Sequence, residues 1–311
     1  RSTALGYAAL TAQNFTTATN TYNVAVGFQA GAAVTTGVQN TLIGGLAGDS
    51  IQAAGDNTAV GYAALSEETG GQNNVAVGRS ALANQNISSG NIYNTAVGSK
   101  AAQSITTGVE NTIIGGFAGN ALQDADFNVA VGASALTTDT LGSRSVAIGT
   151  SALQTQNFAT ATSALNVAVG FQAGLSVTTG VQNTLIGASA GDALNIGKDN
   201  VAVGYVALTS DTKGTDAVAL GKGALQNQNF TTETANYNVA VGRDAGRVVT
   251  TGIYNTILGA LAGDAMTTGS SNTFVGFQAA SNGTVTGDDN TCVGKSAGFS
   301  LNTGSNNTLL G

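Results

Sequence analysis

The chain of 311 residues contains no histidine, no proline and no tryptophan, and its only cysteine is Cys292. Without histidine, Ser-His-Asp and Cys-His catalysis and all histidine-ligated metal sites are excluded. A single cysteine excludes an internal disulfide framework, and we expect Cys292 to be a small buried apolar residue. The absence of proline suits a continuous backbone ladder, because proline has no N–H to donate.

Positive charge is also scarce, with ten Lys and Arg against seventeen Asp and Glu, a net charge of −7 and a pI of about 4.3. Phosphate backbones require clustered cations, so a nucleic-acid partner is disfavoured, as is adhesion to an anionic membrane. No apolar run reaches the length of a membrane span, and no signal peptide is visible. Aromatic residues make up only 5%, which predicts a thin core of Val, Ile, Leu and Ala.

A short unit built on an anchor glycine recurs eighteen times, usually every 17 residues. A fixed period of this size is typical of a solenoid. The step lengthens to 20 or 21 after four of the glycines and is 18 once. The anchors are Gly6, Gly27, Gly44, Gly61, Gly78, Gly98, Gly115, Gly132, Gly149, Gly170, Gly187, Gly204, Gly221, Gly242, Gly259, Gly276, Gly294 and Gly311.

Three positions of the unit are almost invariant. The residue before the anchor is always Val, Ile or Leu, which predicts an inward aliphatic stack, and the residue three after it is always Ala, which predicts a tight interior. The anchor itself predicts a positive φ or a close backbone approach. The residue four before it is Asn in fifteen copies, which predicts a ladder of stacked side chains. These residues are Asn23, Asn40, Asn57, Asn74, Asn94, Asn111, Asn128, Asn166, Asn183, Asn200, Asn238, Asn255, Asn272, Asn290 and Asn307.

The residues between the Asn and the Gly are short and often β-branched, as in Thr58-Ala59-Val60, which favours strand over helix. Seventeen residues would accommodate two short strands and two turns. The sequence therefore predicts an all-β protein, a parallel β-solenoid of about 18 coils. We expect residues 1–311 to form one continuous array. Neither end of the chain carries a recognisable cap, so we expect it to be a segment of a longer polypeptide.

The strand carries apolar residues on both faces. The residue two before the anchor, which should point outward, is Ala in eleven copies, and Leu, Ile, Phe or Cys in the others. One coil cannot bury both faces, so we expect the outer face to pack against another chain in a closed symmetric assembly.

The sequence also repeats over a longer period of four coils, about 72 residues. NVAVGFQAG, for example, occurs at both 23–31 and 166–174, which are two of these longer periods apart. Each four-coil block contains one lengthened coil, whose insertion begins Gln-Asn-Phe or Gln-Asn-Ile. These insertions predict polar projecting loops with one apolar residue each. Those residues could contact a partner, or they could fold back to cover their own coil or the neighbouring chain. They are Phe15, Ile87, Phe158 and Phe230.

The pattern Asn-x-Ala-Val-Gly-x-x-Ala resembles the repeat of YadA-like head domains of trimeric autotransporter adhesins. It is also similar to the NTAVGYQAL-type repeats of phage tail fibres. The resemblance covers essentially the whole chain, although the adhesin coils are usually shorter than 17 residues. It implies a left-handed β-roll, a homotrimer and an extracellular location on a bacterial cell surface or virion. The repeat is structural, so no functional residue carries over with it.

Side chains that could support other functions are sparse. Most acids lie in predicted turns, where we expect them to be solvated, and the only close pairs are Asp124 with Asp126 and Asp288 with Asp289. Neither pair lies in a cleft-forming insertion, so we expect no metal, no cofactor and no glycosidase-type catalysis. Thr-Thr pairs such as Thr35-Thr36 occur once per four coils, which is a poor match to an ice-binding threonine row.

The sequence therefore favours a structural or adhesive fibre shaft over an enzyme. The alternative is a stalk for a phage tail fibre or spike whose enzymatic or receptor-binding tip lies elsewhere. Expected partners are two further copies of the chain, and also a surface glycan, a protein receptor or neighbouring fibres.

Overall fold

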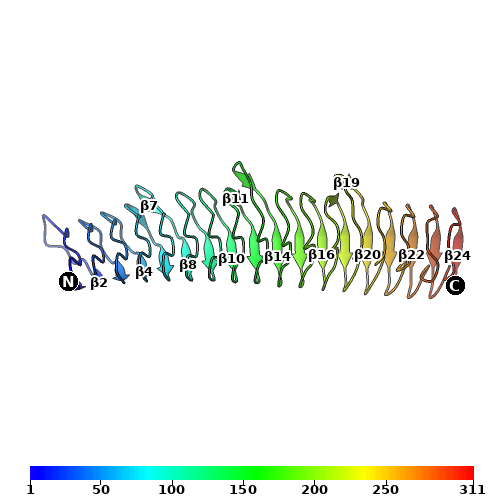
Figure 1. Cartoon of the computed structure of the whole chain (residues 1–311), viewed down its shortest axis with the longest axis horizontal. Helices are drawn as coiled ribbons and strands as arrows, with labels where there is room; N and C mark the ends of the chain where they lie inside the picture. Colours follow the sequence, from blue (N-terminus) through cyan, green and yellow to red (C-terminus); the bar gives the residue numbers. More distant parts are fainter. The chain divides into compact units, whose positions relative to one another are not determined.

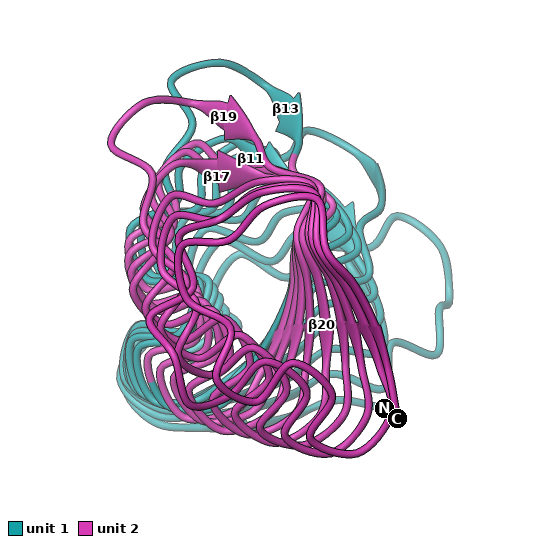
Figure 2. Cartoon of the chain, turned by 90° about the vertical axis from the view of Figure 1, so that its right-hand side faces the viewer, with its two compact units in different colours: residues 1–150, 157–163 teal, residues 151–156, 164–311 magenta.

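The computed structural model describes residues 1–311 and contains no helix, and thus none that could cross a membrane. Every regular element is a β-strand of two or three residues. The chain forms two compact units, one comprising 1–150 and 157–163 and the other 151–156 and 164–311 (Figure 2). Each unit is a parallel β-solenoid of nine coils, which confirms the predicted fold class.

Each coil contributes one three-residue strand to a parallel sheet, and successive strands pair residue for residue, as in Val24 with Thr41 (Figure 1). In the first unit the strands are β1 Thr3–Leu5, β2 Val24–Val26, β3 Thr41–Ile43, β4 Thr58–Val60, β6 Val75–Val77, β8 Thr95–Val97, β9 Thr112–Ile114, β10 Val129–Val131 and β12 Val146–Ile148. In the second they are β14 Val167–Val169, β15 Thr184–Ile186, β16 Val201–Val203, β18 Val218–Leu220, β20 Val239–Val241, β21 Thr256–Leu258, β22 Thr273–Val275, β23 Thr291–Val293 and β24 Thr308–Leu310.

A second strand in every coil was expected, and this was wrong. A second strand occurs only beside the lengthened coils, as three two-residue pairs. The remaining backbone turns repeatedly through the left-handed region, for example at Gln29, Gly31 and Gln39, whose φ values are 54°, 58° and 61°. The two-residue pairs are β5 Gly71–Gln72 with β7 Gly90–Asn91, β11 Gly142–Ser143 with β13 Thr162–Ser163, and β17 Gly214–Thr215 with β19 Thr234–Ala235.

The anchor glycines are required by conformation and by space. Their φ values lie between 128° and 141°, a region that side chains rarely adopt. A Cβ on Gly61 would also lie 2.5 Å from the carbonyl oxygen of Gly78, the anchor of the next coil. The stacked backbones therefore leave no room for a side chain at this position, as the sequence predicted.

The core is narrow and filled by small residues. Ala25, Ala30 and Ala47, at the interior strand position and three after the anchors, are fully buried. Larger residues fit where the neighbouring residue is a glycine. Leu42 fills the space beside Gly48, because a Cβ on Gly48 would lie only 2.7 Å from the Cδ2 atom of Leu42. The invariant Ala thus marks a tight interior, as expected.

Candidate interaction surface

The aliphatic residue before each anchor faces outward, contrary to the sequence-based expectation of an inward stack. The residue two before the anchor is buried instead. In the third coil, for example, the side chain of Leu42 is inaccessible to solvent, whereas that of Ile43 is 38% exposed. No member of the outward row is fully buried in either unit. The prediction reversed the faces because both positions are apolar. The small Ala that prevails two before the anchor is the residue that fits the narrow interior.

Strand alternation places the residue three before the anchor on the same outer face. That residue is Thr or Val in all eighteen coils, so this face carries no charge anywhere along either unit. The threonine hydroxyls, such as those of Thr41 and Thr58, make no hydrogen bond within the chain. We call the two outward rows of each unit its sheet face.

Exposed aromatic residues border the sheet face along both edges. One group directly follows the anchors, as with Tyr62, which is 58% exposed, and the other lies five residues before them. Neighbouring rings stack within these columns: the ring centroids of Tyr7 and Phe28 are 5.5 Å apart, and those of Tyr237 and Tyr254 are 5.7 Å apart. The sheet face is therefore an extended, uncharged surface in each unit, whereas its two edges mix aromatic residues with charged ones, such as Arg144 over the Phe127 ring and Lys222 over the Tyr205 ring.

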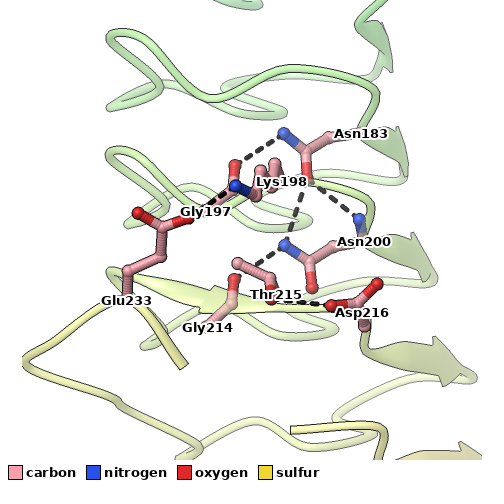
Figure 3. A network of polar contacts seen from close by, with 8 residues as sticks. All are labelled: Asn183, Gly197, Lys198, Asn200, Gly214, Thr215, Asp216 and Glu233. Carbon is pink, nitrogen blue, oxygen red and sulfur yellow. Dashed lines mark hydrogen bonds and ion pairs between the residues drawn. The ribbon is translucent and has the colours of Figure 1, made fainter. Parts of the chain in front are cut away.

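The predicted asparagine ladder lies inside the coil, next to this sheet (Figure 3). Asn183 Nδ2 donates to the carbonyl oxygen of Gly197 at 2.9 Å, and Asn183 Oδ1 accepts the backbone N–H of Asn200 at 3.1 Å. Asn200 repeats the pattern, with its Nδ2 donating to Gly214 at 2.9 Å. Each side chain therefore satisfies backbone groups at a turn where the strand ladder supplies no partner.

The ladder is interrupted where Ala217 replaces Asn, and another asparagine supplies the missing hydrogen-bond acceptor. The N–H of Ala217 still donates to Asn200 Oδ1 at 3.0 Å, but alanine offers no acceptor to the next rung. Asn236, from the following lengthened coil, accepts the N–H of Asn238 at 2.9 Å in its place. Ser145, the other internal exception, likewise donates its N–H to Asn128 Oδ1 at 2.9 Å.

Buried carboxylates lie at the base of the long loops, where the sequence predicted solvated turn acids. Glu68, Asp139 and Asp211 are inaccessible to solvent. Asp211 Oδ1 accepts the backbone N–H groups of Gly214 at 2.9 Å and Phe230 at 3.2 Å. Desolvation raises the pKa of Asp211, an effect that its hydrogen bonds partly oppose.

Two of these acids, Glu68 and Asp211, are each connected to the asparagine ladder through a glutamine. Gln228 Nε2 donates to Asp211 Oδ2 at 2.7 Å, and Gln228 Oε1 accepts from Asn238 Nδ2 at 2.8 Å. Glu68, Gln85 and Asn94 repeat this chain of contacts in the first unit. This acid–glutamine pairing could have been recognised in the sequence. Each acid stands seven residues after an anchor glycine and 17 residues before the Gln that opens an insertion.

The apolar residues of the long loops divide into two pairs. Phe158 and Phe230 are buried, at 5% and 6% exposure, whereas Phe15 and Ile87 are half-buried. Both phenylalanines are turned away from solvent, and the Phe158 ring lies against the preceding coil, where a Cβ on Gly142 would be 2.8 Å from its Cδ2 atom. A contact role for any of the four remains a prediction.

The other candidate residues occupy ordinary positions. Asp124 and Asp126 each accept a hydrogen bond from the preceding coil, from Thr107 Oγ1 and from the N–H of Val109 respectively. Cys292 is buried, as predicted, and desolvation raises the pKa of its thiol.

Comparison with protein-family models, with curated proteins and with solved structures found no match to the chain.

Proposed function

We propose that the chain is the shaft of a homotrimeric surface fibre, assembled through its sheet faces. The uncharged sheet face, present on every coil, carries this proposal. An aliphatic row this regular is unusual on a surface exposed to water, and extended apolar patches typically mark sites of association. A fibre shaft also accounts for the periodic coils of both units.

A second copy of the chain is the partner that fits best, because it has the same coil spacing. Strands of stacked coils lie about 4.8 Å apart, so only a partner with the same repeat can match the rows rung by rung. Half-exposed Val and Ile would each contribute roughly 0.5–1 kcal/mol on full burial, or roughly 5–9 kcal/mol over nine rungs. Closed symmetry then limits growth, and the resemblance to trimeric adhesin heads favours three chains.

Placement on a cell or virion surface, and attachment to a glycan or protein receptor, form the finer part of the proposal. They rest on the resemblance of the repeat Asn-x-Ala-Val-Gly-x-x-Ala. A phage-fibre stalk and an adhesin shaft share this architecture.

The mass in solution tests the assembly. Sedimentation equilibrium should give three times the chain mass of 30.5 kDa. Val60→Asp combined with Val203→Asp places one charge on the sheet face of each unit and should produce a folded monomer. The matched control is Ala53→Asp combined with Asn195→Asp, which adds the same charge on exposed turns and should remain trimeric. A monomeric wild type, or a double sheet-face variant that stays trimeric, would contradict the proposal.

A further inference from the structure

The long loops carry a second feature, a three-residue pattern that recurs in their sequences. Three of the four insertions read Asn-x-Ser or Asn-x-Thr: 14–16, 86–88 and 229–231. The fourth begins with Asn157 but has Ala159 at the third position. Asn-x-Ser/Thr is the acceptor pattern for N-glycosylation. We propose that Asn14, Asn86 and Asn229 are acceptors for a glycosyltransferase that uses a nucleotide-activated sugar.

The acceptor amides are accessible. Asn14, Asn86 and Asn229 are all exposed. Asn86 Oδ1 accepts from Thr69 Oγ1 at 2.8 Å, and Asn229 Oδ1 accepts from Thr212 Oγ1 at 3.0 Å. In both side chains the Nδ2 atom makes no hydrogen bond within the chain. The carbonyl contact therefore holds the amide in place and leaves its nitrogen facing solvent.

The third residue of each pattern is accessible too. Ser88 and Thr231 are exposed, and neither hydroxyl has a partner in the chain. In the second unit the middle residue, Phe230, is buried, whereas Asn229 and Thr231 on either side of it are exposed.

The loops also project away from the sheet face. In Figure 2 the loop before β19 extends beyond the coils of the second unit, whereas strands such as β20 lie on another side of the section. A sugar on Asn229 would therefore leave that unit's sheet face uncovered. The proposal does not depend on trimer formation.

The structure excludes the ladder asparagines as acceptors. Asn183 and the equivalent internal residues are buried, and the residue two further on always points into the core. Two other matches lie outside the long loops. Residues 306–308 end in β24, which is paired with β23, whereas Asn282 and Thr284 are as exposed as the loop residues, so the structure does not exclude Asn282 as a further acceptor. The proposal concerns the three loops.

The reaction is a simple substitution. The Nδ2 atom forms a bond to the anomeric carbon of the sugar, and the bond from that carbon to the phosphate oxygen breaks. The nucleoside diphosphate leaves, and the proton lost from Nδ2 passes to a base of the transferase.

The experiment treats the folded chain with UDP-glucose and a soluble N-glycosyltransferase specific for Asn-x-Ser/Thr, followed by peptide mapping by mass spectrometry. We expect one hexose each on Asn14, Asn86 and Asn229 and none on Asn157, whose Oδ1 accepts from Thr140 at the same 3.0 Å as in the Asn229 loop. Ser88→Ala should remove only the Asn86 modification, and Ala159→Thr should add one at Asn157.

Two results would overturn the proposal. One is no transfer to the three loops while the enzyme modifies an isolated peptide spanning residues 84–92. The other is transfer to Asn157 in the wild-type chain, since the third-position hydroxyl would then play no part.

Discussion

Replacing Asn183 with alanine tests whether the asparagine ladder stabilises the coil. The variant removes the Nδ2 donor to Gly197 and the Oδ1 acceptor for the N–H of Asn200 (Figure 3). Both backbone groups belong to buried residues. Each unsatisfied buried group costs about 1–3 kcal/mol, so for two groups we expect the local free energy of unfolding to fall by about 2–6 kcal/mol.

The assay must resolve local stability, because repeat proteins open coil by coil and need not unfold in one step. Hydrogen exchange of the Asn200 amide should accelerate strongly in Asn183→Ala, together with a lower melting temperature. The control is Asn195→Ala, an exposed asparagine of the adjacent turn, which should change stability by less than about 0.5 kcal/mol. Unchanged exchange at Asn200 would refute the reasoning, because it would mean that water replaces the side chain without cost.

Three further outcomes follow from the same structure. Ala202→Asp buries an unpaired charge at a fully buried position and should cost about 3–5 kcal/mol, measured by thermal unfolding; a loss below 1 kcal/mol would contradict the assignment of the inner face. Gly61→Ala places a Cβ 2.5 Å from the oxygen of Gly78 and should lower the melting temperature, whereas Ala53→Gly on an exposed turn should not. Because burial raises the pKa of Asp211, the folded chain binds more protons than the unfolded chain between the ordinary and raised pKa values, and stability falls as pH rises through that window. Asp211→Asn should remove this slope, and identical pH profiles for the two proteins would show that the carboxyl does not titrate on unfolding.

Much of the fold could be predicted because the chain repeats one local environment many times. The period fixed the number of coils, and the recurrent Asn and Gly identified a turn that needs both a polar cap and a left-handed backbone. Each inference relied on residue types with few structural alternatives. Gly61, for example, stands where no other residue fits.

The orientation of the strand could not be predicted in the same way. Alternation divides a strand into two faces, but it identifies the inner face only when one face is polar. Here Leu42 and Ile43 are both aliphatic, and the row with larger side chains was taken as the core. The buried residue is Ala in most coils, and a larger one such as Leu42 lies beside a glycine, Gly48, so side-chain size rather than polarity distinguishes the inner face.

The buried acids were missed for a different reason. Glu68 and Asp211 lie in turn-like sequence beside Gly and Thr, where a carboxylate is normally solvated. Only their spacing to Gln85 and Gln228 marked them as interior, and that relation spans a whole coil. Such pairs are 17 residues apart in the sequence but lie next to each other in stacked coils. They can be recognised only when each residue is compared with the one a full coil further along.

These acids connect each lengthened coil to the coil before it. The carboxylate of the preceding coil accepts a backbone N–H from the insertion: Glu68 accepts from Ile87 at 3.2 Å, as Asp211 does from Phe230. The longer acid accompanies the shorter insertion, since the step is 20 residues after Gly78 and 21 after Gly221. The acid, the glutamine and the insertion recur together, at Glu68 with Gln85 and at Asp211 with Gln228. An insertion copied without its acid would leave backbone N–H groups such as that of Phe230 without this acceptor.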